Sequence, residues 1–267
     1  MTPIEMRKTI RSGQWRQSTA GEACGYVQSN LVILPASLSS DFRLFCARNP
    51  RPCPVLVELT EGSPVVPRFV AHDADIRTDL PSYRIYRDGH LTDEVNDLLN
   101  FWREDFIAFL LGCSFSFDGA LIEEGLPVRH VEQRKNVPMF ITNRDCVPAG
   151  KLQGPVVVSY RPMPQELLQK AVDISRVYPL LHGGPVHIGD PTELGIRDLN
   201  YPDWGDAVER EEGDIAMFWA CGVTPQAVAL HSKIPLMISH SPGHMFVTDI
   251  PISALRNRAE LKGFNQT

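Results

Sequence analysis

The segment FLLGCSFSFDGALIEEGLPVRHVEQRKNVPMFITN, residues 109–143, has a counterpart later in the chain. The counterpart is MFWACGVTPQAVALHSKIPLMISHSPGHMFVTD, residues 217–249. In each segment an apolar stretch ends at a cysteine, a polar turn follows, and a short amphipathic stretch comes next. A proline then precedes a further extended segment. We interpret the two segments as copies of one strand-loop-helix unit.

The alignment of the two segments rests on a few landmarks. With Cys113 placed on Cys221, Pro127 falls on Pro235 at the same distance downstream. After a two-residue difference in length, the motif MFITN matches MFVTD. The alternative is chance similarity, because strand-turn-helix units are common in proteins.

The repeat predicts an α/β fold. Two similar units side by side favour a mostly parallel sheet with helices on both faces. In the second unit Thr224 is a plausible N-cap with Pro225 at the first helical position, and in the first unit Ser116 can cap the helix. Ligands of parallel sheets bind where strands end and helices begin, so we expect the two cysteine loops to face one crevice.

The segment between the units has a different character. Residues 154–163 are rich in β-branched residues and predict a strand, residues 164–178 predict an amphipathic helix, and residues 185–191 predict a strand that ends in a tight turn. This run predicts a small inserted α+β domain. The expected organisation is a main α/β domain over 1–143 and 207–267, with the inserted domain over 144–206.

The chain before the first unit gives three further predictions. GYVQSNLVILP (25–35) and SLSSDFRLFCARNP (37–50) are predicted helical, and VLVELTEG (55–62) is predicted as a buried strand. The pair Asp88-Gly89 between extended arms is a strong hairpin signal.

Composition narrows the function classes. The chain has 267 residues, a net charge of −6 and no basic cluster, which argues against nucleic acid as a partner. No apolar run is long enough for a membrane span and no signal peptide is expected. The six cysteines are widely spaced without a CxxC pair, which favours free thiols in a cytoplasmic protein. The expected partner is a small anionic substrate, and self-association into a homo-oligomer is left open.

Several long motifs together identify a resemblance. RSGQWRQSTAGEACGYVQSNLVILP, FCARNPRPCPVL, DIRTDLPSYRIYRDG, FLLGCSFSFDGAL, VPMFITN, HGGPVHIGDP, FWACGVTPQAV and HSPGHMFVTD resemble the bacterial "putative hydro-lyase" family related to D-glutamate cyclase. The resemblance covers about residues 10–250. It implies a lyase of amino acid metabolism that eliminates water, with closure of D-glutamate to 5-oxo-D-proline as the model reaction. We do not expect the additional domain of the larger mitochondrial cyclases in this chain.

The model reaction defines what a site must supply. The amine must lose a proton, one carboxyl oxygen must leave as water, and the tetrahedral intermediate needs fixed donors. A cation must hold the other carboxylate. No phosphate-binding GxxxxGK[ST] loop is present, and neither a cofactor nor a metal is expected, since no HExxH or zinc-type spacing occurs.

Four residues are candidates for proton transfer. His244 and Asp249 lie in HSPGHMFVTD, and His187 and Asp190 lie in PVHIGDP. Each histidine can act as a general acid or base, and each aspartate can orient a histidine or take a proton. The alternative for each is a structural or capping residue in a turn.

The candidates for substrate binding are the groups at the cysteine loops and two arginines. Hydroxyls and backbone N–H groups at helix N-termini suit an anion, and guanidinium groups bind carboxylates through two hydrogen bonds. Buried cysteines, ordinary N-caps and surface arginines are the alternatives. The predicted binding residues are Cys113, Ser114, Ser116, Cys221, Thr224, Arg77 and Arg84.

Two other functions remain open from the sequence. A carbon–nitrogen hydrolase or lactam-handling enzyme would use the same groups for tetrahedral chemistry in reverse. A protein that binds an anionic metabolite without catalysis would need only the anion site.

Overall fold

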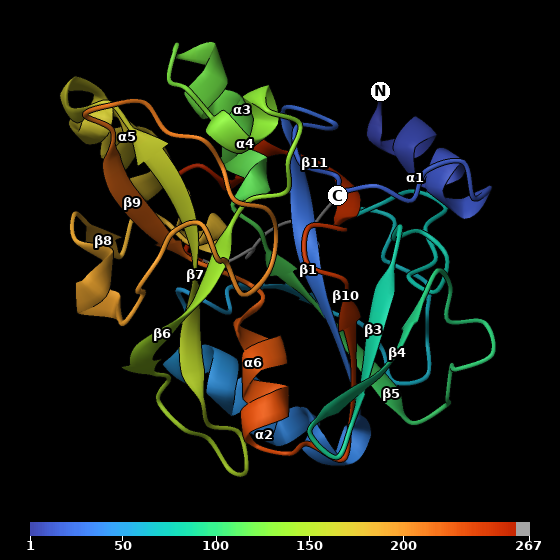
Figure 1. Cartoon of the computed structure of the whole chain (residues 1–267). Helices are drawn as coiled ribbons and strands as arrows, with labels where there is room; N and C mark the ends of the chain where they lie inside the picture. Colours follow the sequence, from blue (N-terminus) through green and yellow to red (C-terminus); the bar gives the residue numbers. More distant parts are fainter. Residues whose placement is uncertain (260–267) are drawn as a thin grey trace.

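Two antiparallel sheets with flanking helices make up the protein, whose computed structural model describes residues 1–259. The larger sheet has seven strands in the order β2-β5-β1-β10-β3-β4, and β11 also pairs with β1. The smaller sheet has the order β6-β7-β9-β8. Figure 1 shows the larger sheet around the central strand β1 and the smaller sheet beside it.

The elements follow one another along the chain as β and α segments in irregular alternation. The strands are β1 (Tyr26–Pro35), β2 (Val55–Glu58), β3 (Tyr83–Arg87), β4 (His90–Val95), β5 (Phe106–Gly112), β6 (Met139–Asp145), β7 (Pro155–Met163), β8 (His187–Ile188), β9 (Ile215–Ala220), β10 (Leu236–His240) and β11 (Phe246–Pro251). The α-helices are α1 (Pro3–Arg11), α2 (Ala36–Arg48), α3 (Phe115–Glu123), α4 (Arg129–Glu132), α5 (Leu168–Arg176) and α6 (Thr224–His231). Short 3-10 turns lie at Gln165–Leu167, Pro179–Leu181, Pro191–Leu194 and Ile252–Leu255.

The predicted mostly parallel sheet is wrong, because every strand pair within the described residues is antiparallel. The two strand-loop-helix units also do not share one sheet. The first starts at β5 in the larger sheet and leads through α3 to β6 in the smaller one. The second starts at β9 in the smaller sheet and leads through α6 to β10 and β11 in the larger one.

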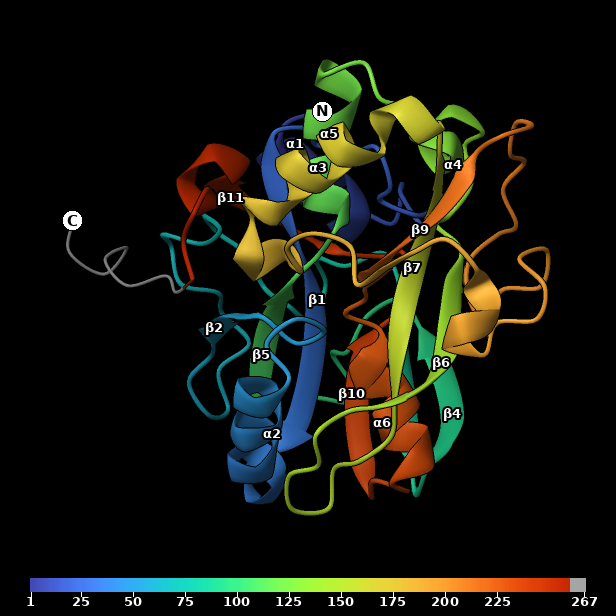
Figure 2. The same ribbon diagram turned by 90° about the vertical axis from the view of Figure 1, so that its left-hand side faces the viewer.

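The physical reason for this error lies in burial on both faces. On β1, Leu31 and Ile33 pack into one core, while Val32 and Leu34 pack into a second core on the opposite face. Such strands have continuous apolar sequences, which is the usual signature of a parallel sheet. Here helices cover both faces of an antiparallel sheet, as the two views in Figures 1 and 2 show.

The aligned residues of the two units nevertheless occupy equivalent register positions. The ribbon β5-β1-β11 corresponds to β9-β7-β6. In the first, Ser29 of β1 pairs with Gly112 on one side and Phe246 on the other. In the second, Val158 of β7 pairs with Ala220 and Phe140 in the same way. The last strand of the first unit, β6, therefore lies in the smaller sheet, and the last strand of the second unit, β11, lies in the larger sheet.

Hydrogen bonds repeat this equivalence. The Ser116 hydroxyl accepts a bond from the backbone N–H of Gln28 at 2.9 Å, and the Thr224 hydroxyl accepts one from Val157 at 3.1 Å. Both hydroxyls thus tie the start of a helix to the central strand of its sheet. Neither caps its own helix: the N-cap positions are Ser114 and Val223, with no side-chain cap bond.

Other elements agree with or depart from expectation. The hairpin at Asp88-Gly89, the helix α2 and the strands β2 and β7 are confirmed. The predicted helix at 25–35 is wrong, since this segment is strand β1. The division into 1–143, 144–206 and 207–267 stays a prediction, although the smaller sheet joins strands from all three segments. No helix among the described residues is long and apolar enough to cross a membrane.

Candidate active site

The two strand-loop-helix units meet at a cleft of about 590 Å³. The loop before β6 and the loop before β11 are equivalent in the repeat, and they touch where Asn136 donates a hydrogen bond to the Pro242 carbonyl at 3.0 Å. Gly243 has a φ of +86°, and a Cβ there would lie 2.3 Å from the Asn136 amide. A glycine is therefore required at this contact.

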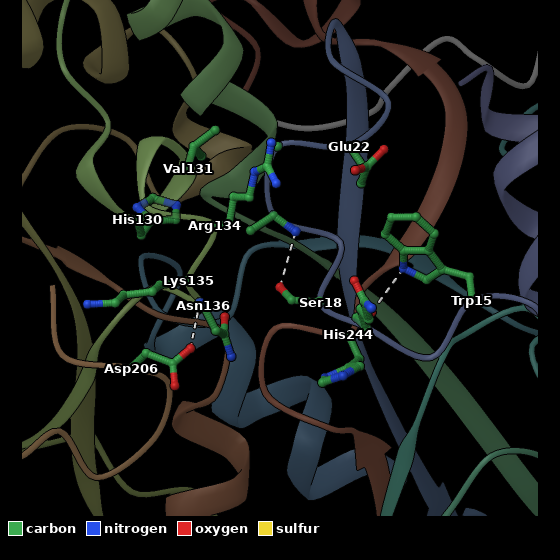
Figure 3. Close-up of a pocket in the computed structure, with 13 residues that line it drawn as sticks. Trp15, Ser18, Glu22, His130, Val131, Arg134, Lys135, Asn136, Asp206 and His244 are labelled. Atoms are coloured by element: carbon green, nitrogen blue, oxygen red, sulfur yellow. Dashed lines mark hydrogen bonds between the residues drawn. The ribbon is translucent and has the colours of Figure 1, made fainter.

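A third wall of the cleft comes from the N-terminal loop. The Thr19 backbone N–H donates to the Gly243 carbonyl at 2.9 Å, and the Thr19 hydroxyl accepts from the Met245 N–H at 3.1 Å. These bonds fix the N-terminal loop on the HSPGHM turn. The residues lining the cleft are Trp15, Gln17, Ser18, Ala20, Gly21, Glu22, His130, Val131, Arg134, Lys135, Asn136, Asp206 and His244 (Figure 3).

His244 is the predicted proton-transfer residue that the structure places in this cleft. Its Nδ1 lies 3.1 Å from the Pro242 carbonyl oxygen. Because a carbonyl only accepts, this contact is a hydrogen bond in the tautomer that carries its proton on Nδ1. Burial lowers the pKa of His244, and the Pro242 carbonyl partly opposes this. The ring is therefore a neutral base at pH 7.

His130 is a second histidine of the cleft, and it was missed from the sequence. It is 1% exposed, and its Nε2 lies 3.1 Å from Asp118 Oδ2. Burial lowers the pKa of His130, while the neighbouring Asp118 opposes this shift. Since the carboxylate only accepts, Nε2 carries the proton and Nδ1 is the basic atom.

Asp118 is held in the ionised form by a buried arginine. Arg161 Nε and Nη2 donate to the two carboxylate oxygens of Asp118 at 2.9 and 3.0 Å. Burial alone would raise the pKa of Asp118, but Arg161 and His130 lower it below its ordinary value. The same guanidinium donates to the hydroxyls of Ser114 and Ser159, both at 3.1 Å.

A sequence signal for this network did exist. Asp118 interrupts the apolar helix FSFDGALI, and Arg161 interrupts the apolar strand VVVSYRPM. Charged residues are rarely buried unless they are paired. Two opposite charges in two otherwise apolar elements are therefore expected to contact each other.

The other predicted proton-transfer residues lie away from the cleft lining. Asp249 accepts two hydrogen bonds from Arg7 at 2.9 Å and one from the His72 backbone at 2.7 Å. His187 Nε2 contacts the Asp190 carbonyl at 2.8 Å, and the Asp190 carboxylate caps the turn at Thr192. These contacts are those of turn and strand anchors.

The predicted binding residues are also not brought together around the cleft. Cys113 and Cys221 are buried in one apolar cluster, and burial raises the pKa of Cys221 to about 11. Ser114, Ser116 and Thr224 are buried, and the last two bond backbone groups of β1 and β7. Arg77 pairs with Asp75 at 2.6 Å and Arg84 with Glu94 at 3.1 Å.

Glu94 supports the turn that carries His244. Its carboxylate accepts hydrogen bonds from the hydroxyls of Ser241 at 3.0 Å and Ser82 at 3.3 Å. The two hydroxyls are themselves 2.8 Å apart. The β3-β4 hairpin thus holds the start of the HSPGH turn in place. Arg84 pairs with Glu94 and so supports this turn only indirectly.

No group of three or more His, Cys, Asp or Glu side chains that could hold a metal ion occurs in residues 1–259. All six cysteines are free thiols.

The buried histidines make a testable prediction about acid stability. Burial lowers the pKa of His240 to about 3 and that of His182 to about 4, and it also lowers the pKa of His130. Below pH 6.5 the unfolded chain binds protons that the folded chain does not, so the folded state loses stability as pH falls from 6.5 towards 3. We expect a loss on the order of 2 kcal/mol for each of His240 and His182 between pH 6.5 and 5.

Urea unfolding at pH 7, 6, 5 and 4 measures this loss. Substitution of the exposed His90 by Asn is the matched control and should leave the acid sensitivity unchanged. An unfolding free energy that stays constant between pH 7 and 5 would contradict the prediction.

The structure defines a mixed α and β protein with a cleft that His130 and His244 line. The family model for D-glutamate cyclase matches residues 107–249. A "putative hydro-lyase" of Bacillus licheniformis is 55% identical over 250 residues, which cover 94% of this chain and 95% of the relative. The chain therefore belongs to the D-glutamate cyclase family.

Other relatives show the same extent of similarity. The "putative hydro-lyase YcsI" of Bacillus subtilis is 54% identical over 94% of this chain and 97% of its own length. A "putative hydro-lyase" of Rubrobacter xylanophilus is 57% identical over 92% of this chain and 94% of its own length. A solved structure, a nitrogen repressor-like protein from Methanococcus jannaschii, aligns with a TM-score of 0.38 at 11% identity over 88% of this chain and 91% of its own length.

Proposed function

We propose that this protein is a lyase that eliminates water from a small acidic amino or hydroxy acid in the cleft described above. The model reaction is closure of D-glutamate to 5-oxo-D-proline. The observation that carries the proposal is the combination of two histidines, neutral at pH 7, with an arginine in one cleft. Membership of the D-glutamate cyclase family and the names of the relatives support the reaction class.

The proposed reaction assigns different steps to the two histidines. One neutral imidazole takes a proton from the substrate ammonium, and the free amine attacks the carbon of the side-chain carboxyl group. A carbon–nitrogen bond forms, and one carboxyl oxygen leaves as water after it has received protons. The imidazolium formed in the first step supplies one of these protons. The attacking nitrogen loses a second proton when the lactam forms, and the second histidine passes that proton to the leaving oxygen.

The cations of the cleft have a separate role in this proposal. Arg134 lines the cleft, and its guanidinium has no hydrogen-bond or ion-pair partner among residues 1–259. It binds the substrate carboxylate that does not react, because guanidinium and carboxylate groups form paired hydrogen bonds. The Lys135 ammonium is occupied by the Ala207 carbonyl at 2.9 Å, so Arg134 is the better candidate.

His130 has the stronger support as the base, because Asp118 fixes its tautomer. The proton on Nε2 points to Asp118, which leaves the lone pair of Nδ1 on the other side of the ring. The arrangement has the same logic as an aspartate that orients a catalytic histidine in other enzymes. His244 then acts as the partner acid or base. The proposal includes a cytoplasmic location, which six free thiols support.

The test is a substrate panel. Pure protein is incubated with both enantiomers of glutamate and aspartate, with 2-hydroxyglutarate, and with the lactams of the amino acids, and the products are measured by mass spectrometry. We expect a product 18 mass units lighter than one acidic substrate, since water is lost. Opening of a lactam without any measurable closure would instead support the hydrolase function, and binding without turnover would support a binding protein.

A further inference from the structure

Two oppositely charged side chains of the cleft have no partner among residues 1–259. The carboxylate of Glu22 lines the same cleft as the guanidinium of Arg134. Within residues 1–259, neither side chain has a hydrogen bond or ion pair with any other group. Elsewhere on the surface, arginines of this chain are commonly paired, as in Arg43–Glu58, Arg87–Asp93 and Arg103–Asp105.

The backbone on both sides of this pair is fixed. Gly21 has a φ of +78°, and a Cβ at this position would lie 3.0 Å from Val131 Cγ1. The loop that carries Glu22 therefore packs closely on the helix that precedes Arg134. The Gln28 amide also donates to the Glu22 carbonyl at 2.9 Å, which holds the loop from the β1 side.

Arg134 itself has a strained backbone. Its φ is +53°, in the left-handed region that residues other than glycine rarely adopt. The Arg134 N–H donates to the Val131 carbonyl at 3.1 Å, and the next residue, Lys135, donates to the His130 carbonyl at 2.8 Å. Strain of this kind persists where the surrounding structure enforces it, and it concentrates at ligand sites.

We propose that Glu22 and Arg134 together select a substrate that carries an ammonium and a carboxylate group, and hence an amino acid over the matching hydroxy acid. This inference rests on the proposed function and names the substrate class of the same cleft. A carboxylate accepts hydrogen bonds and has no donor, so it attracts an ammonium group and gains little from a neutral hydroxyl. The guanidinium binds the carboxylate that both kinds of acid share.

Neither histidine of the cleft forms a pair with Glu22. His130 is engaged with Asp118, and His244 with the Pro242 carbonyl, so neither ring is used to neutralise Glu22. The remaining acidic residue of the cleft, Asp206, accepts the Asn136 backbone N–H at 2.8 Å. Glu22 is therefore the carboxylate available to a bound ammonium group.

The experiment compares two ligands on two variants. Glutamate of the active enantiomer and 2-hydroxyglutarate of the same configuration are measured by calorimetric titration against the wild type, Glu22→Gln and Glu166→Gln. Glu166 is exposed, does not line the cleft and serves as the matched control. We expect Glu22→Gln to weaken glutamate binding about 10- to 100-fold, to leave 2-hydroxyglutarate within about 3-fold, and Glu166→Gln to change neither.

Equal weakening of both ligands, or no change for glutamate, would overturn the role of Glu22. A wild type that binds neither ligand, nor any other acid of the panel, would overturn the proposed function itself, and the assignment of Glu22 would fall with it. The melting temperature of Glu22→Gln is measured alongside, and it should stay within about 2 °C of the wild type, because the side chain has no partner to lose.

Discussion

Replacement of Arg161 by Met is expected to lower the free energy of unfolding by about 3–5 kcal/mol. Arg161 is 1% exposed and donates to both carboxylate oxygens of Asp118, which is equally buried. Removal of the guanidinium leaves that carboxylate buried without its main partner. The guanidinium also packs on the rings of Phe117 and Trp219, with its central carbon 5.4 Å from each centroid.

Chemical denaturation measures this effect, and two further variants make it specific. Arg43→Met breaks the exposed pair with Glu58 and should cost at most about 1 kcal/mol. The double substitution Asp118→Asn with Arg161→Met removes both charges and should recover part of the loss. If Arg161→Met costs no more than Arg43→Met, the buried network does not have the role that we assign to it.

Substitution of His244 by Asn is expected to reduce turnover by about 10²- to 10⁴-fold, the range that a positioned acid–base group contributes. Asparagine can still donate to the Pro242 carbonyl, so the turn should keep its shape. Because His244 is half-buried and not part of an apolar core cluster, the melting temperature should change little. Steady-state kinetics on the substrate found in the panel, together with thermal melting, measure both quantities.

The matched control for this experiment is His187→Asn. His187 is also a half-buried histidine that contacts a turn carbonyl, but it lies on β8 and not in the lining of the cleft. Full activity is expected for this variant. A large loss of turnover in His187→Asn with none in His244→Asn would transfer the catalytic role to PVHIGDP.

The local parts of the fold could be predicted because their signals are local. The Asp88-Gly89 hairpin depends on two residues that accept positive φ values, and both adopt them, at +49° and +77°. The match between the segments that begin at Cys113 and Cys221 reflects equal hydrogen-bond patterns at Ser116 and Thr224. Residues that make equivalent hydrogen bonds in two repeated units can be recognised from the sequence even when the sheet to which each strand belongs is unknown.

Local signals could not predict to which sheet each strand belongs, or whether neighbouring strands are parallel or antiparallel. A strand, a helix and a second strand that are consecutive in sequence normally belong to one sheet. Here the chain crosses from one sheet to the other within each unit, and nothing in the apolar pattern of β5 or β9 distinguishes these cases. The contact between Asn136 and Pro242, which creates the cleft, depends on this exchange.

The residues that line the candidate cleft could be predicted from the sequence only in part, for a related reason. His244 was predicted because glycine, proline and histidine stand together in one short turn. His130 was missed because its partner Asp118 lies on another helix, and the Arg161 that orients Asp118 lies on β7. Glu22 and Arg134 carry no local signal, because a charged residue in a loop looks the same in the sequence whether or not it has a partner in the fold.

The central claim is that the cleft with His130 and His244 is where the acidic substrate binds. Imidazole NMR of protein labelled at its eight histidines tests this directly, with each signal assigned from single substitutions. Titration with the acidic amino acid that the panel identifies should shift the signals of His130 and His244 and leave those of His187 and His90 unchanged. Shifts at His187 without shifts at His130 and His244 would contradict the account.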